Sequence, residues 1–220
     1  MTNRQRSHPT AALALSTIVV CGGAEAKPIA YAHGTTVMAE YGAGTMTELQ
    51  IFYAPRYFLS AGAGYLTLDS DIDGRKSDIA YGRLNYLVKR WNLEDAQANL
   101  FTWGGIGGAR VDDAHDTFAW NAGVQLDYET RRVYFSAKSD YHNSADLSHR
   151  IDTLQVGVAP YRHHYEGLAT WFVLQGRDYT GEIHDGIEWA ALLRLFKGSA
   201  WVEAGATTEG KLQAMFMFNF

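Results

Sequence analysis

Apolar and polar residues alternate with a period of two along most of the chain. The clearest stretch is residues 118–129, "FAWNAGVQLDYE", in which every second residue is apolar and, from Asn121 on, the residues between are polar or glycine. Residues 132–142, "RVYFSAKSDYH", alternate in the same way. This period is typical of a β-strand with one apolar face, whereas few stretches show the 3.6-residue period of a helix.

A short turn at Thr130 and Arg131 would join these two stretches as a hairpin. Directly opposed residues of an antiparallel pair lie on the same face of the sheet, so they should match in polarity. A two-residue turn pairs Glu129 with Arg132 and Trp120 with Tyr141, and the residues do match. We therefore predict a hairpin in this register.

The same pattern predicts twelve strands and no helix between them. Turn-rich stretches such as "DSDIDGRKS", "HNSADLSH" and "RDYTGEIHDG" separate them. Ten strands is the alternative, if the first two are irregular. Twelve strands leave about 16 residues each, which suits membrane strands of about 9–11 residues with short connections. The predicted strands lie near residues 34–42, 46–55, 57–68, 77–89, 97–110, 117–129, 132–143, 150–161, 165–176, 186–196, 200–207 and 211–220.

Two all-β architectures compete for this pattern. A soluble sandwich buries its apolar faces in a core, whereas a transmembrane barrel turns them to lipid and keeps polar or small residues inside. Many predicted strands have ten or more residues, which a sandwich of this size seldom has. Glycines also recur on the expected inner faces, where they relieve crowding or permit bending. We therefore predict an up-and-down antiparallel barrel without a plug domain.

The N-terminus has the features of an export signal. Arg4 and Arg6 precede an apolar stretch, "AALALSTIVVC", that is too short to span a membrane as a helix, and "AEA" at 24–26 is a small-residue cleavage site. We predict a cleaved signal peptide at residues 1–26 and one barrel domain at 27–220. Cleavage after "AYA" at 30–32 and a lipoprotein at Cys21 are alternatives.

Composition excludes some classes of function. The formal net charge is −5 and the chain has no run of Lys or Arg, so it lacks the basic surface that nucleic-acid binding requires. Cleavage after Ala26 removes Cys21, the only cysteine. The mature protein then has no disulfide and no thiolate metal site, which is common for a membrane barrel.

The chain ends in "AMFMFNF", with aromatic residues at alternate positions. Together with the predicted signal peptide, this end resembles the C-terminal strand of bacterial outer-membrane β-barrel proteins, in Gram-negative cells. The resemblance implies that Phe216, Phe218 and Phe220 are read by the barrel-assembly machinery, and that the barrel contacts outer-membrane lipids and lipopolysaccharide. It also implies that both termini lie in the periplasm. It names a superfamily and no particular function, and the oligomeric state stays open.

Polar residues of the expected inner faces are candidates for lining the lumen. They carry both charge signs, whereas a channel for acidic sugars would need a strongly basic lumen. A narrow, weakly selective pore for small solutes or ions is one hypothesis, and a closed barrel lined with ion pairs is the alternative. The candidates are Glu40, Asn121, Gln125, Asp127, Glu129, Arg132, Lys138, Asp140, Glu188, Arg194 and Glu203.

Histidines beside carboxylates recur at the expected outer ends of strands. Imidazole and carboxylate suit borderline divalent cations, and carboxylates alone could bridge to the ions of lipopolysaccharide. No cofactor is otherwise expected. The candidate metal ligands are His115, His142, His149, His184 and Asp185.

A third hypothesis is enzymatic. The spacing of His142 and Ser144 in "YHNSAD" resembles that of the lipid A deacylases, which cleave an acyl ester with His, Ser and an acidic partner. The residue after Ser144 is Ala145, where that family has Asn. Asp152 is the candidate acidic partner, because an activated serine needs a base and an orienting group.

Overall fold

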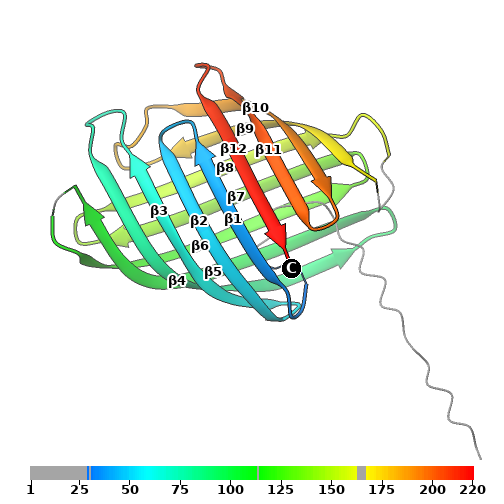
Figure 1. Ribbon diagram of the computed structural model, residues 1–220, viewed down its shortest axis with the longest axis horizontal. Coiled ribbons are helices and arrows are strands. Elements are labelled where there is room, and N and C mark those ends of the chain that lie inside the picture. Colours follow the sequence, from blue (N-terminus) through cyan, green and yellow to red (C-terminus); the bar gives the residue numbers. More distant parts are fainter. Residues whose placement is uncertain (1–28, 30, 113, 163–166) are drawn as a thin grey trace, which may run out of the picture.

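A computed structural model describes residues 29, 31–112, 114–162 and 167–220, and the chain forms a closed barrel of twelve antiparallel strands (Figure 1). Each strand pairs with its neighbours in sequence, so the predicted count and topology are confirmed. Residues 1–26, the predicted signal peptide, lie outside the described residues. No helix in the described ranges is long and apolar enough to cross a membrane. The strands are β1 (Thr35–Gly42), β2 (Met46–Arg56), β3 (Leu59–Asp69), β4 (Lys76–Asn92), β5 (Ala96–Val111), β6 (Thr117–Thr130), β7 (Val133–Ser144), β8 (Ser148–Val158), β9 (Ala169–Tyr179), β10 (Ile187–Lys197), β11 (Ala200–Thr207) and β12 (Leu212–Asn219).

The two ends of the chain close the barrel. β1 pairs with β12, and the register places Val37 opposite Phe218. The backbone N–H of Thr35 donates to the carbonyl of Phe220 at 2.7 Å, and the N–H of Phe220 donates back at 3.0 Å. Closure leaves no strand edge exposed, which a barrel in lipid requires. Following the expected orientation, we call the end that holds Thr35 and Phe220 the inner end and the opposite end the outer end.

The β6–β7 hairpin differs from the predicted register by two residues. Glu129 pairs with Tyr134 rather than Arg132, because the turn is wider than predicted. The hydroxyl of Thr130 accepts hydrogen bonds from the backbone N–H groups of Arg132 (3.1 Å) and Val133 (2.8 Å), and these bonds hold the wider turn. A shift of two leaves each residue on its predicted face, since strand side chains alternate with period two.

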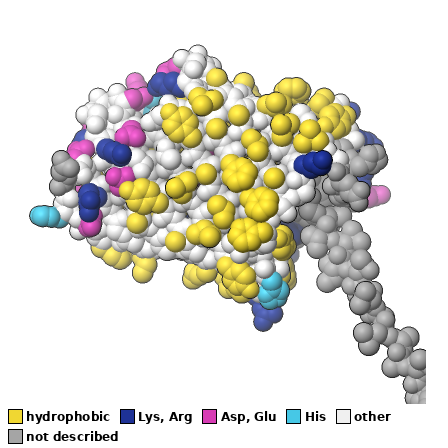
Figure 2. Space-filling model, viewed as in Figure 1, with side chains coloured by type: hydrophobic (Ala, Val, Ile, Leu, Met, Phe, Trp, Pro, Cys, Tyr) yellow, Lys and Arg dark blue, Asp and Glu magenta, His cyan; other side chains and the backbone are white. Residues whose placement is uncertain are grey.

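The outer surface of the barrel is apolar. Large hydrophobic side chains project outward from nearly every strand, among them Ile51, Leu84, Ile106, Leu154 and Phe172. They cover the middle of the face in Figure 2, whereas most of the visible charged side chains gather toward one end. Such a belt would be unfavourable in water but is the surface that a hydrocarbon layer solvates.

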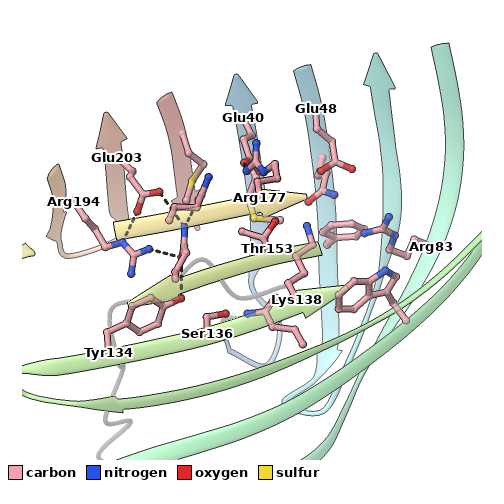
Figure 3. A pocket seen from close by; sticks show the side chains of 18 residues that line it. Glu40, Glu48, Arg83, Tyr134, Ser136, Lys138, Thr153, Arg177, Arg194 and Glu203 are labelled. Atoms are coloured by element: carbon pink, nitrogen blue, oxygen red, sulfur yellow. Dashed lines mark hydrogen bonds and ion pairs between the residues drawn. The ribbon is translucent and has the colours of Figure 1, made fainter. Parts of the chain in front are cut away.

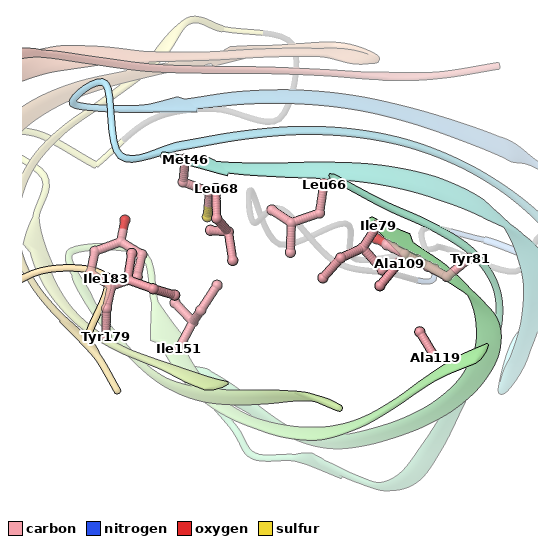
Figure 4. Packing of buried hydrophobic residues seen from close by; sticks show 10 residues of the cluster. All are labelled: Met46, Leu66, Leu68, Ile79, Tyr81, Ala109, Ala119, Ile151, Tyr179 and Ile183. Carbon is pink, nitrogen blue, oxygen red and sulfur yellow. The ribbon is translucent and has the colours of Figure 1, made fainter. Parts of the chain in front are cut away.

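Apolar side chains also fill both ends of the lumen, which the prediction of a polar or small-residue interior missed. At the outer end, Leu66, Leu68, Ile79, Ile151 and other residues form a buried cluster that we call the outer cluster (Figure 4). At the inner end, one cluster contains Trp171 and a second contains Phe101. The lumen is therefore packed with apolar side chains at both ends, beside buried polar residues such as Glu188 and Asp127.

Candidate functional site

A cavity of about 110 Å³ lies among the side chains in the middle of the lumen (Figure 3). Strand alternation places one residue in every two of each strand on this inner face. The lining combines charged, amide and hydroxyl groups with a few apolar ones. It consists of Met38, Glu40, Glu48, Gln50, Phe52, Arg83, Trp103, Gln125, Tyr134, Ser136, Lys138, Thr153, Gln155, Gln175, Arg177, Arg194, Glu203 and Met215.

Arg194 and Glu203 form the first ion pair of the lining. They are directly opposed on β10 and β11, and Arg194 Nε lies 2.5 Å from Glu203 Oε2. A second guanidinium nitrogen donates to Gln155 Oε1 at 2.8 Å. The guanidinium also stacks 4.4 Å from the ring centroids of both Tyr134 and Trp201. Packing and pairing together hold this charge in one place inside the barrel.

Arg177 and Glu40 form the second ion pair. It joins β9 to β1 across the lumen, and Arg177 also donates to the hydroxyl of Tyr179 at 3.3 Å. The Glu40 side chain keeps 23% of its surface exposed, whereas that of Arg177 keeps 3%. The carboxylate therefore faces the cavity while the guanidinium is fixed behind it.

Asp140 is the centre of the third group. Its carboxylate accepts from Arg83 at 3.2 Å and from the indole N–H of Trp103 at 3.0 Å. The indole lies against Gly123, where a Cβ would overlap the ring. Glycine at this position thus makes room for the ring that bonds to Asp140.

Lys138 and Glu48 have weaker partners than the other charges of the lining. Lys138 Nζ lies 3.9 Å from Asp140, the carboxylate that already pairs with Arg83, and 29% of the Lys138 side chain is exposed. Glu48 accepts a 2.6 Å hydrogen bond from the hydroxyl of Tyr81. Within the described residues, no ion pair within 4.0 Å joins Glu48 to a base.

The two charge signs occupy different parts of the wall. The acidic residues of the lining lie on β11, β1 and β2, which with β12 form one continuous part of the barrel. The basic residues lie on β4, β7, β9 and β10. The cavity is therefore nearly balanced in charge but polarised from one side to the other. The acidic set is Glu40, Glu48 and Glu203, and the basic set is Arg83, Lys138, Arg177 and Arg194.

Of the other predicted lumen residues, four lie above or below this cavity, one lines it and one lies outside the lumen. Asn121 and Glu188 are buried toward the outer end, and Asp127 and Glu129 are buried toward the inner end. Gln125 lines the cavity. Arg132 departs from the prediction, because it sits exposed in the wide β6–β7 turn and its guanidinium donates to the carbonyls of Ala159 and Pro160, both at 3.4 Å.

Sequence reasoning did not find Glu48, Arg83 or Arg177, although all three line the cavity. The β4 sequence around Arg83 reads "DIAYGRLNYLV", which carries large apolar residues on both faces. Period-two parity therefore gives no clear inner face there. The signal that could have found Arg83 is its charge, because a charged residue in the middle of a membrane strand belongs inside the barrel.

Two of the predicted metal ligands meet inside the lumen rather than in the loops. His142 and His149 are opposed on β7 and β8, both are buried, and their rings stack with centroids 5.1 Å apart. His142 Nε2 lies 3.4 Å from Asp140.

The remaining predicted ligands lie apart from this pair. His184 Nδ1 lies 2.6 Å from Asp71, which Lys211 also approaches at 3.8 Å, and His115 and Asp185 are exposed. The described part of the chain contains no group of three or more His, Cys, Asp or Glu residues arranged to hold a metal ion.

The residues of the deacylase hypothesis are not brought together. His142 and Ser144 share the inner face, but neither side chain forms a hydrogen bond among the described residues. The neighbouring strand places Asp152 on the outer face, where it accepts from Arg150 at 2.7 Å. A serine nucleophile needs a base within hydrogen-bond reach, so this arrangement does not form a catalytic triad.

The loop between β9 and β10, residues 180–186, crosses the outer end of the barrel, and we call it the cap loop. Ile183 is 4% exposed and packs into the outer cluster. Its carbonyl accepts from the N–H of Asp71 at 3.0 Å, and the carbonyl of Glu182 accepts from the Ser70 hydroxyl at 2.7 Å. Because β3 and β4 lie opposite β9 and β10 in the strand order, these contacts bridge the mouth.

The β3–β4 loop that receives the cap loop is itself held by charge. Asp73 accepts from the backbone N–H of Arg75 at 3.0 Å and from its guanidinium at 2.5 Å. The backbone N–H of Arg75, the Ser70 hydroxyl and the Arg75 guanidinium lower the pKa of Asp73 to about 2. Arg75 also lies 3.7 Å from Glu182 of the cap loop, so the same residue contacts both loops.

The apolar belt, the charged lumen and the closed strand order together define a transmembrane β-barrel. Among solved structures, the chain is similar to a KdgM porin in complex with disordered oligogalacturonate, with a TM-score of 0.45 and 8% sequence identity. That match covers 84% of this chain and 96% of the porin chain. No family model matches the sequence, and no curated protein matches it.

Proposed function

We propose that the protein is a narrow channel of the bacterial outer membrane for small solutes or ions. The observation that carries this proposal is the cavity of ionisable and amide side chains enclosed by a barrel with an apolar exterior. Keeping charges inside a membrane protein is costly, and such charges typically mark solute or ion pathways. The balanced lining does not favour a channel for long acidic sugars.

Passage through this barrel would require the packed side chains at both ends to move, and the outer end to open. The cap loop and the outer cluster close the lumen above the cavity, and the inner clusters narrow it below. The cap loop is a short connection held by a few hydrogen bonds and ion pairs, so it is the part of the closure that could move at the lowest cost. We therefore infer that the structure represents the closed state of a channel.

Export and insertion complete the proposal. Residues 1–26 would direct export and be removed, and the outward-facing Phe216, Phe218 and Phe220 would serve recognition by the assembly machinery. The apolar belt would contact outer-membrane lipids and lipopolysaccharide.

A permanently closed barrel is the second candidate, since matched ion pairs and apolar clusters fill most of the lumen. Single-channel recording separates the two functions. Residues 27–220 are refolded, folding is shown by circular dichroism and heat-modifiable migration, and the protein is added to a planar bilayer in KCl. Stepwise openings are expected. A folded protein that gives no current would contradict the channel and favour the closed barrel.

A further inference from the structure

The ion pairs of the cavity leave one base and one acid that are not matched to each other. Arg194 pairs with Glu203, and Arg177 pairs with Glu40. Arg83 pairs with Asp140. What remains in the described lining is the ammonium of Lys138 and the carboxylate of Glu48.

These two groups have unused capacity to bind a solute. The ammonium of Lys138 has three donors, and its nearest carboxylate is 3.9 Å away and shared with Arg83. The carboxylate of Glu48 can accept several hydrogen bonds, whereas it receives a single side-chain bond, from Tyr81, among the described residues. Each group is therefore better satisfied when an opposite charge enters the cavity.

Lys138 and Glu48 also lie on separate walls. Lys138 belongs to β7 and Glu48 to β2, with four strands between them on one side of the barrel and six on the other. Figure 3 shows their side chains at the cavity on different strands. Thr153 is directly opposed to Lys138 on β8, and Gln50 shares the inner face of β2 with Glu48. Amide and hydroxyl groups thus lie around the two charges and can bond to the body of a polar solute.

We propose that this cavity selects small zwitterions, solutes such as α-amino acids that carry an ammonium and a carboxylate on one short skeleton. The solute carboxylate pairs with Lys138 and the solute ammonium pairs with Glu48. An anion or a cation gains one of these contacts and is repelled by the other charge, and a neutral solute gains neither. The cavity volume of about 110 Å³ restricts the class to small molecules. This inference rests on the proposed channel function.

Matched solutes test the selection. Proteoliposomes containing refolded residues 27–220 are mixed with isosmotic glycine or with glycolamide, its neutral isomer, and the swelling rates are compared. We expect glycine to enter about two- to fivefold faster, because the interaction energy of one partly exposed ion pair changes a rate or an equilibrium by about this factor. Lys138→Gln and Glu48→Gln should each bring the ratio close to one. Lys197→Gln, which removes an exposed lysine at the end of β10 that does not line the cavity, is the matched control and should keep the ratio.

The outcomes separate this inference from the channel itself. Equal rates for glycine and glycolamide in the folded wild type would overturn zwitterion selection but would not contradict the proposed channel function. Faster entry of sodium glycolate than glycine would replace it with an anion site at Lys138. If no solute enters and no current flows through the folded protein, the channel fails and the selection fails with it. Heat-modifiable migration shows that each variant is folded.

Discussion

At the scale of single residues, one glycine determines where a key side chain of the lumen lies. Gly123 on β6 leaves the space in which the Trp103 indole packs, and that indole donates to Asp140 at 3.0 Å. Asp140 in turn holds Arg83. A methyl group at position 123 would therefore displace the Trp103 indole, and this would disturb the carboxylate of Asp140 that pairs with Arg83.

The first prediction concerns this glycine. Gly123→Val forces the indole away and breaks its bond to Asp140, so we expect a loss of about 1–3 kcal/mol in the free energy of unfolding, as for other overpacked cores. Urea unfolding of the protein refolded into lipid vesicles measures it. Gly104→Ala is the control, since a Cβ there meets nothing nearer than the Asn121 carbonyl at 3.9 Å. Equal stabilities of the two variants would contradict the packing argument.

The second prediction concerns Asp73 in the β3–β4 loop. Hydrogen bonds from Arg75 and Ser70 lower its pKa to about 2, so the folded loop favours the ionised carboxylate. A lowered pKa adds stability above the ordinary Asp value of about 3.9, and that stability is lost as the pH falls toward 2. We expect the loop to keep its structure at pH 4 to 5 and to loosen below that range. A ¹³C NMR titration of the Asp73 carboxyl checks this, and a midpoint near 4 would refute it.

At the scale of elements, the strands could be predicted from the sequence and the packing inside the barrel could not. Alternation over residues 118–129 gave β6 and its faces, because lipid and lumen impose opposite demands on neighbouring residues. The predicted register of β6 and β7 was wrong by two residues. The Thr130 hydroxyl holds a wider turn through hydrogen bonds to the backbone, and the alternation of apolar and polar residues gives no information about such bonds. Strand ends also shifted, and β9 begins at Ala169 rather than near residue 165.

The candidate site was predicted in part for a similar reason. Lys138, Arg194 and Glu203 were found because period-two parity placed them on the inner face of their strands. Parity also placed His142 on the inner face, but its contact with His149 depends on the pairing of β7 with β8. The pairing of Arg177 with Glu40 joins strands far apart in the sequence and requires the closed barrel. The apolar clusters were missed because the polarity rule describes a water-filled lumen, and this lumen is packed at both ends.

The third prediction concerns the cap loop. Residues 27–220 contain no cysteine, so Ser70→Cys with Glu182→Cys introduces one pair, at the point where the Ser70 hydroxyl contacts the Glu182 carbonyl. If the cap loop must move for the channel to open, oxidation of this pair should abolish most of the current, and a reducing agent should restore it. Each single cysteine variant is the control. A disulfide confirmed by mass spectrometry that leaves the current unchanged would show that solutes take another path.

At the scale of the whole molecule, the barrel separates three environments by strand geometry alone. Outward side chains meet lipid, loops meet water, and inward side chains form a polarised cavity between apolar ends. Three ion pairs cancel most of the charge around the cavity. Ion preference should therefore depend on the few charges that the pairs do not cancel, although many ionisable groups lie inside.

The fourth prediction follows from this balance. The reversal potential of the wild type in a KCl gradient is the reference value, because Lys138 and Glu48 offset each other in it. Lys138→Gln removes a base and should shift the preference toward K⁺, whereas Glu48→Gln removes an acid and should shift it toward Cl⁻. The double variant should return close to the wild-type value, since the net charge of the lining is then restored. Shifts of the same sign in both single variants, or none in either, would mean that these two residues do not face the permeating ions.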